Sequence, residues 1–166
     1  QHTGQYRRTG HEYISHPLAV AKILAEMRMD HQTLMAALLH DVIEDTHTDR
    51  ATVAKKFGKS VAEIVDGVSK LSKIFHSKDE PHAENFQKMA LAMAKDIRVI
   101  LVKIADRLHN MRTLDSINSE EKKIRIAKET MEIYAPLANR MGMNHIRDEL
   151  EDLSFQKLNP EARQLV

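Results

Sequence analysis

The 166-residue sequence contains no cysteine, and only five glycines and four prolines. Without cysteine there are no disulfide bonds, thiolate metal ligands or cysteine nucleophiles, so any bound metal must be held by His, Asp and Glu. The absence is compatible with a reducing compartment, and we expect a cytoplasmic protein. Because glycine and proline are scarce, there are few places where a helix is forced to stop.

The chain also lacks a strong charge of one sign and a long apolar run. Its formal net charge of +1 excludes the broad basic surplus of a general nucleic-acid-binding protein. No apolar run approaches the roughly 20 residues of a membrane-spanning helix, and the N-terminus has no secretory signal pattern. We therefore expect one domain over residues 1–166 that binds neither nucleic acid nor membranes.

Apolar residues recur at intervals of three and four along most of the chain, which predicts an all-α protein. A capping box at Ser60–Glu63 marks one helix start, Thr48 or Asp49 caps the short helix before Gly58, and Ser119 caps another helix. The β-branched stretch 97–104 would permit a strand, but its pattern continues at helical spacing through Met111. The polar segment 72–84 is predicted to be a loop. The predicted helices span approximately residues 16–29, 30–40, 49–57, 60–71, 83–95, 96–114, 119–138 and 144–158.

The most informative motif is His40-Asp41-Val42-Ile43-Glu44-Asp45, which follows a buried-helix pattern. On one continuous helix, His40 and Glu44 lie one turn apart, as do Asp41 and Asp45. Four ionisable groups at the end of an apolar helix are unfavourable unless a positive charge compensates them. A divalent cation is the simplest compensation, although a purely structural His40–Asp41 pair is the alternative.

Two further positions complete a candidate metal site. Asp106 shares a helix face with Asn110 and Thr113, and His16 stands at the start of the first helix. Together with His40 and Asp41, they supply two imidazoles and two carboxylates, a set that suits Mn²⁺, Fe²⁺ or Zn²⁺ better than Ca²⁺. The alternatives are that His16 caps its helix and that Asp106 pairs with Arg107 or a lysine.

The H…HD…D pattern resembles the HD superfamily of metal-dependent phosphohydrolases. With its flanks included, nearly the whole chain resembles the hydrolase domain of RelA/SpoT enzymes, above all the SpoT-type bifunctional members. The matching blocks are HTGQYRRTGHEYISHPLAVAKILAEM, AALLHDVIEDT, FGKSVAEIVDGVSKL, AENFQKM, DIRVILVKIADRLHNMRTL and IAKETMEIYAPLANRMG. In the RRT block, Arg8 stands where many relatives have lysine and Thr9 where many have serine, which keeps the charge and the hydroxyl.

The resemblance implies an HD-type helical bundle with one Mn²⁺ in its core, bound by His16, His40, Asp41 and Asp106. It also implies that Glu44 and Asp45 serve the hydrolytic step. The guanine nucleotide would be held by Arg7, Arg8, Thr9, Asn110, Arg112 and Thr113. Bifunctional relatives continue into synthetase and regulatory domains, so we expect this chain to be a hydrolase domain excised from such an enzyme.

The predicted reaction removes the 3′-pyrophosphate of guanosine tetra- or pentaphosphate (ppGpp or pppGpp), giving GDP or GTP and ending the stringent-response signal. Glu44 and Asp45 would orient or deprotonate water and protonate the leaving oxygen, acting as a coupled pair. Tyr13 or an arginine plane would stack near the base. Two alternatives are another HD-type nucleotide phosphohydrolase and a regulatory module that binds guanine nucleotide without cleaving it.

Overall fold

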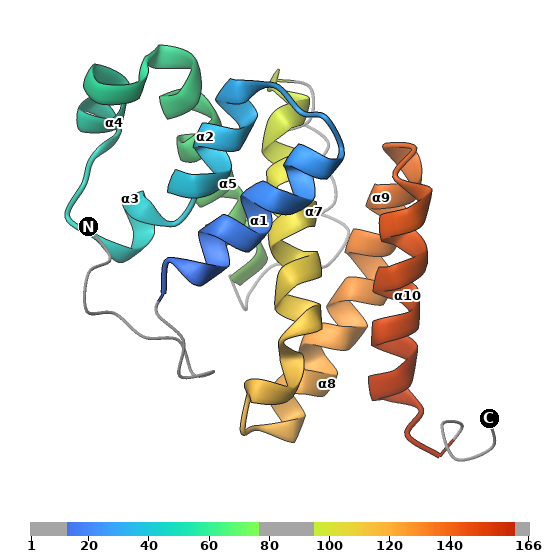
Figure 1. Ribbon diagram of the computed structural model, residues 1–166. Helices are drawn as coiled ribbons and strands as arrows, with labels where there is room; N and C mark the ends of the chain where they lie inside the picture. The colour runs from blue at the N-terminus through green and yellow to red at the C-terminus, as the bar shows by residue number, and fades with distance from the viewer. Residues whose placement is uncertain (1–12, 77–94, 162–166) are drawn as a thin grey trace. The chain divides into compact units, whose positions relative to one another are not determined.

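The computed structural model describes residues 13–76 and 95–161, with the backbone alone for residues 74–76. Every regular element within these ranges is a helix, which confirms the predicted all-α class (Figure 1). None of the described helices combines the length and the apolar character needed to cross a membrane. The predicted helix over 83–95 lies almost wholly outside the described residues, as does the predicted loop from residue 77 onward.

The chain divides into two compact units, and the long helix α7 (Ile97–Arg112) passes from one to the other after Ala105. The described part of the first unit also contains α1 (Ser15–Glu26), α2 (His31–Leu39), α3 (Val42–Asp45), α4 (Arg50–Phe57) and α5 (Lys59–His76). That of the second contains η1 (Leu114–Ser116), α8 (Glu120–Glu129), η2 (Thr130–Tyr134), α9 (Ala135–Arg140) and α10 (Asn144–Leu158).

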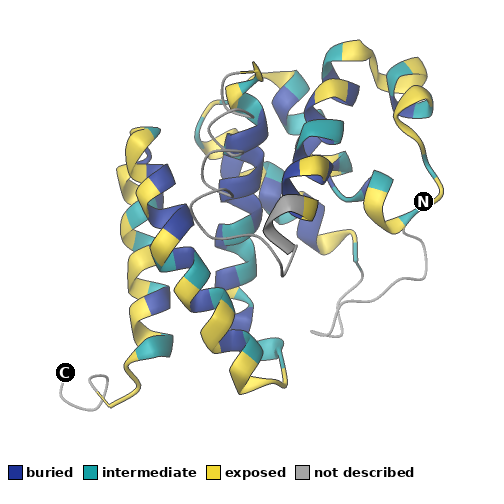
Figure 2. Cartoon of the chain, turned by 180° about the vertical axis from the view of Figure 1, so that it is seen from behind, coloured by how far each residue is buried: buried dark blue, intermediate teal, exposed yellow. Residues whose placement is uncertain are grey.

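The core of the first unit forms around α5, which packs against α2, α3 and α4, while α1 packs against α2. Its buried apolar side chains include Leu24, Ile64 and Ile100, and Figure 2 colours the buried residues of the described helices dark blue. The expectation that Leu38 of α2 faces inward is wrong, because Leu38 is 37% exposed and the buried residues of α2 are Thr33, Ala36 and Ala37. A Cβ atom added to Gly67 of α5 would lie 2.6 Å from Val99 Cγ2 of α7. A larger residue at this position would therefore have to displace the Val99 side chain.

Side-chain caps define three of the helix starts. Asp30 accepts a hydrogen bond from the Thr33 backbone N–H at 3.1 Å at the start of α2. Asp49 and Ser119 cap α4 and α8 in the same way, which confirms both predicted starts. Each cap satisfies a backbone donor that the first turn of a helix leaves without an intrahelical partner.

The predicted capping box at Ser60 is wrong. Helix α5 already begins at Lys59, and the Ser60 hydroxyl donates to Gln32 Oε1 at 2.9 Å instead of capping its own helix. The predicted loop over 72–76 is also wrong, because α5 continues to His76. Ser72 is buried, so its polarity reflects a polar contact inside the protein rather than exposure in a loop.

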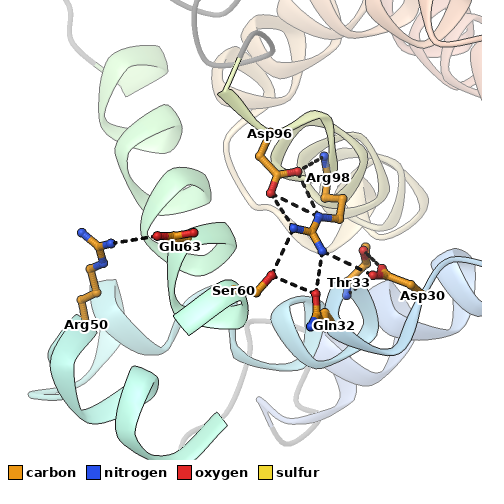
Figure 3. A network of polar contacts seen from close by, with 8 residues as sticks. All are labelled: Asp30, Gln32, Thr33, Arg50, Ser60, Glu63, Asp96 and Arg98. Carbon is orange, nitrogen blue, oxygen red and sulfur yellow. Dashed lines mark hydrogen bonds and ion pairs between the residues drawn. The ribbon is translucent and has the colours of Figure 1, made fainter. Parts of the chain in front are cut away.

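A polar cluster joins the N-terminal ends of three helices in the first unit (Figure 3). We call it the Arg98 cluster; its members are Asp30, Gln32, Ser60, Asp96 and Arg98. The Arg98 guanidinium donates to Asp96 Oδ2 at 2.8 Å, Gln32 Oε1 at 2.9 Å and Ser60 Oγ at 3.1 Å. It also reaches Asp30 Oδ2 at 3.3 Å. One guanidinium thus ties the starts of α2, α5 and α7 together.

In the second unit, the helix predicted over 119–138 is interrupted by a π-helical turn, η2, before Pro136 of α9. A proline ring clashes with the carbonyl one turn before it, and a wider turn relieves the clash. Tyr134, at the end of this turn, is fully buried, and the Arg107 guanidinium lies 4.1 Å from its ring centroid. The same guanidinium pairs with Glu129 at 3.1 Å. Helix α10 packs against α8 and α9 to close the core.

Candidate metal centre

His16 lies in the first turn of α1 and is only 3% exposed. The N-cap position belongs to Ile14, and no side chain makes a capping hydrogen bond there. His16 is therefore not a helix cap. A buried imidazole in the first turn needs a polar environment, since burial of an unsatisfied ring nitrogen is unfavourable.

The His40-Asp41 pair sits where two helices meet, not on one continuous helix as predicted. Helix α2 ends at Leu39 and α3 begins at Val42, so the expected one-turn relation between His40 and Glu44 on a single helix is wrong. The relation between Asp41 and Asp45 survives, because the Asp45 N–H donates to the Asp41 carbonyl at 2.8 Å. The break lets His40 point inward while the acidic groups that follow reach the surface: His40 is fully buried, and Glu44 and Asp45 are exposed.

The hydrogen bond of the His40 ring orients its second nitrogen. Nδ1 lies 2.7 Å from the carbonyl oxygen of Ala37. A carbonyl oxygen only accepts, so Nδ1 carries the proton and the neutral ring has its lone pair on Nε2. A backbone carbonyl that fixes the tautomer in this way is typical of metal-binding histidines.

Three of the four predicted ligands converge within the described residues. His16, His40 and Asp106 each offer one ligand atom, and these atoms lie within 4.8 Å of one another. All three residues are buried. Asp106 follows Ala105 on the continuous helix α7, so the helix fixes its direction. His40 also contacts His16 edge-to-face, with ring centroids 5.2 Å apart.

The donor set fits a divalent transition metal. Bonds from such ions to nitrogen and oxygen are about 2.0–2.2 Å long, so ligands on opposite sides of one ion lie about 4 Å apart. The three atoms, which lie within 4.8 Å of one another, are close to that range. The mixture of imidazole and carboxylate is one that Mn²⁺, Fe²⁺ and Zn²⁺ accept.

Asp41, the fourth predicted ligand, borders this group without being one of its three members. Its Oδ2 atom lies 3.1 Å from His40 Nε2 and 3.9 Å from His16 Nε2. The same oxygen faces both imidazoles, so Asp41 can join a shared ion through Oδ2. That placement follows from its position at the start of α3, directly after His40.

Tyr13 links Asp41 to the predicted catalytic pair. Its hydroxyl lies 2.6 Å from Asp41 Oδ2 and 2.5 Å from Asp45 Oδ2. Burial, together with these two carboxylates, raises the pKa of Tyr13 well above its usual range, so the hydroxyl remains a donor. Sequence reasoning predicted only that this ring stacks near a base. It gave no sign that Tyr13 joins two carboxylates 28 and 32 positions away.

The predicted nucleotide-binding residues of α7 and its end already have protein partners. Asn110 donates to Asp106 Oδ1 at 2.7 Å, a contact that orients this carboxylate. The Thr113 hydroxyl donates to the His109 carbonyl at 3.0 Å. Arg112 makes a two-bond ion pair with Glu149, at 2.6 and 2.8 Å. Arg7, Arg8 and Thr9 lie outside the described residues.

Lys103 is a residue near this site that sequence reasoning missed. It precedes Asp106 by one turn of α7, is only 8% exposed, and donates to Ser72 Oγ at 2.8 Å. Lysine is rarely buried to this extent. The signal was available in the sequence, because Lys103 interrupts the apolar run that the periodicity predicts to be core.

Comparison with known proteins agrees with this centre. A family model described as HD domain matches residues 1–144. The guanosine-3′,5′-bis(diphosphate) 3′-pyrophosphohydrolase of Haemophilus influenzae is 57% identical over 166 residues, 99% of this chain and 24% of the relative. The bifunctional (p)ppGpp synthase/hydrolase SpoT of Escherichia coli is 58% identical, again over 99% of this chain and 24% of the relative. The chain thus spans about a quarter of the length of these curated relatives.

A solved structure is also similar. It is described as a metazoan ortholog of SpoT that hydrolyzes ppGpp, is 29% identical, and superposes with a TM-score of 0.57. The match covers 99% of this chain and 88% of that chain. The similarity therefore extends over the whole helical architecture and is not limited to the motif around His40.

Proposed function

Because the chain belongs to the HD-domain family, we propose that it is a metal-dependent phosphohydrolase that acts on ppGpp or pppGpp. The reaction adds water across the bond between the 3′ oxygen and its pyrophosphate, giving pyrophosphate and GDP or GTP. The observation that carries this proposal is the convergence of His16, His40 and Asp106, with Asp41 beside them. Similarity to relatives named for this hydrolysis gives the substrate class.

We propose Mn²⁺ as the ion, held by His16, His40, Asp41 and Asp106. When bound, a divalent ion stabilises negative charge on phosphoryl oxygens and makes water easier to deprotonate near neutral pH. The protein contributes the geometry: Ala37 fixes the His40 tautomer, and Asn110 holds the Asp106 carboxylate. Contacts of this kind behind the ligands keep a metal site ordered.

We propose that Glu44 and Asp45 handle the protons of the reaction. Both are exposed, so substrate and water can reach them, and both lie on α3 directly after the ligand pair. One carboxylate takes the proton from the attacking water, and the other returns a proton to the departing 3′ oxygen. Because the two carboxylates are neighbours on the same short helix, the two roles are assigned to the pair and not to either residue alone.

The substrate carries several phosphate charges, and we propose that Arg7, Arg8, Thr9, Asn110, Arg112 and Thr113 bind it. Arg112 is paired with Glu149, so a phosphate would compete with that carboxylate for the guanidinium. A phosphate can present two of its oxygens where the carboxylate presented its two, so the guanidinium keeps its two-bond geometry. Asn110 would serve two purposes, because one of its N–H groups is already engaged with Asp106.

We further propose that the chain works as the hydrolase domain of a larger cytoplasmic enzyme. Curated relatives of similar sequence are about four times as long, and one is named as a bifunctional synthase and hydrolase. A synthetase domain and regulatory domains would then be the partners of this domain.

The proposal is tested by measuring pyrophosphate release from ppGpp, with metal-free protein as the starting material. We expect release that depends on added Mn²⁺ and stops with a chelator. Comparison with dGTP separates this activity from that of a general HD-type nucleotidase, which would cleave dGTP at a similar rate. Binding of ppGpp without any release would instead identify a regulatory module and contradict the proposal.

A further inference from the structure

Tyr13 occupies a position that joins the metal centre to the proton-handling pair. It lies just before α1, and its backbone carbonyl accepts the His16 N–H at 3.1 Å, so the ring is fixed relative to the start of that helix. The ring meets His16 edge-on, with centroids 6.5 Å apart and planes at 77°. From there the hydroxyl reaches Asp41 and Asp45, which stand one turn apart at the two ends of α3.

The two carboxylates accept from one oxygen that carries one proton. Asp41 Oδ2 and Asp45 Oδ2 lie 2.6 and 2.5 Å from the Tyr13 hydroxyl. Carboxylates this close repel one another, and a shared donor offsets part of that repulsion. Because the Tyr13 hydroxyl is so close to both acceptors, it limits the rotation of each carboxylate.

Asp41 Oδ2 is also the oxygen that faces both imidazoles, at 3.1 Å from His40 Nε2 and 3.9 Å from His16 Nε2. The hydroxyl therefore selects which oxygen of Asp41 points into the proposed metal site. Asp45 is exposed, and an exposed aspartate otherwise samples several rotamers. A donor on a partly buried ring, held against His16, restricts it to one direction.

From these contacts we infer that Tyr13 is a positioning residue, whose hydroxyl holds the Asp41 ligand and the Asp45 carboxylate in one arrangement. This inference rests on the proposed function, and it gives Tyr13 a role other than the base stacking expected from the sequence. Tyr13 does not act on the substrate. It acts through Asp41 on metal affinity and through Asp45 on turnover, and these two effects can be measured separately.

The test is Tyr13→Phe, which removes the hydroxyl and keeps the ring against His16. Mn²⁺ binding is measured without substrate, by electron paramagnetic resonance of the free ion. We expect the affinity for Mn²⁺ to fall about tenfold, because loss of a group that orients a ligand typically lowers affinity 10- to 100-fold. At saturating Mn²⁺ we expect kcat for ppGpp to fall about tenfold with KM little changed, since Asp45 loses its donor.

Tyr134→Phe is the matched control, because Tyr134 is a fully buried tyrosine whose ring lies against the Arg107 guanidinium. It should lower the midpoint of thermal unfolding and leave Mn²⁺ affinity as in the wild type. Equal Mn²⁺ affinity in Tyr13→Phe and wild type would overturn the inference, as would equal losses in both variants. The measurement of Mn²⁺ affinity does not depend on hydrolysis, so it tests the role of Tyr13 even if the wild-type protein fails to hydrolyse ppGpp.

Discussion

Helix α7 carries a polar cluster near each end, and the two differ in how their charges are balanced. At its start, the Arg98 cluster contains its own cation: one guanidinium contacts the carboxylates of Asp30 and Asp96 (Figure 3). At Asp106, imidazoles and carboxylates converge instead, and the tautomer of His40 leaves a lone pair on Nε2. The first arrangement is suited to stability. The second is suited to binding a cation, and the same helix therefore separates a structural cluster from a functional one.

The largest effect should follow from Asp106→Ala. Removal of a ligand carboxylate should lower Mn²⁺ affinity by more than about 100-fold, beyond the loss expected for a residue behind the ligands. Hydrolysis of ppGpp should be lost as well. Asp96→Ala, directly before the same helix, is the control, and this variant should unfold more easily while binding Mn²⁺ as the wild type does. Similar Mn²⁺ affinities in the two variants would erase the distinction between the clusters.

A smaller effect, on turnover alone, is expected for Glu44→Gln. The amide cannot accept the proton of water, so kcat should fall by about 10²- to 10³-fold, within the usual range for a general base. Mn²⁺ affinity should stay within about twofold, because Glu44 is exposed and is not one of the ligands. Glu63→Gln provides a comparison on α5, where an exposed glutamate pairs with Arg50 at 3.7 Å. If Glu44→Gln hydrolysed ppGpp at the wild-type rate with saturating Mn²⁺ and ppGpp, the proposed role of Glu44 in proton transfer would be contradicted.

The smallest effect concerns Arg98→Met, which should change stability and not function. Loss of a partly buried guanidinium with several hydrogen bonds should lower the free energy of unfolding by about 1–3 kcal/mol. Mn²⁺ affinity should be unchanged. Urea unfolding at pH 7 measures the loss. If Arg98→Met and the wild type had the same free energy of unfolding, Arg98 and its contacts would contribute nothing to stability.

The pH dependence of that loss supplies a second check. Hydrogen bonds from Arg98 hold the pKa of Asp96 below its ordinary value of 3.8. A carboxylate with a lowered pKa in the folded state stabilises the protein above the unfolded pKa, and this contribution disappears as the pH falls through the folded value. The difference between wild type and Arg98→Met should therefore shrink below about pH 3.8. A difference that grows on acidification would contradict the assignment.

Most helices could be predicted from the sequence because their burial follows the helical period. The stretch 97–104 shows why length matters: its β-branched residues suit a strand, yet the apolar pattern continues into α7. The predictions failed where tertiary contacts override local signals. Ser60 has the sequence of a cap but donates to Gln32, and the break after Leu39 separates His40 from Glu44.

The convergence of the proposed metal ligands could be predicted because their residue types and order are typical of such a site. His16, His40 and Asp106 meet as expected, and Asp41 faces both imidazoles. The contacts of Tyr13 could not be predicted, because nothing in the sequence around a tyrosine that precedes a helix indicates which distant carboxylates it will contact. The partner of Arg112 was hidden for the same reason, since Glu149 lies 37 positions away.

The central claim is that four side chains share one ion, and a crystal structure of the Mn²⁺-soaked protein tests it most directly. Anomalous scattering at the manganese absorption edge locates the ion independently of the protein atoms. We predict one peak within about 2.2 Å of a nitrogen or oxygen of His16, His40, Asp41 and Asp106, the distance typical of such bonds. A peak elsewhere, or none in protein that hydrolyses ppGpp, would contradict the account.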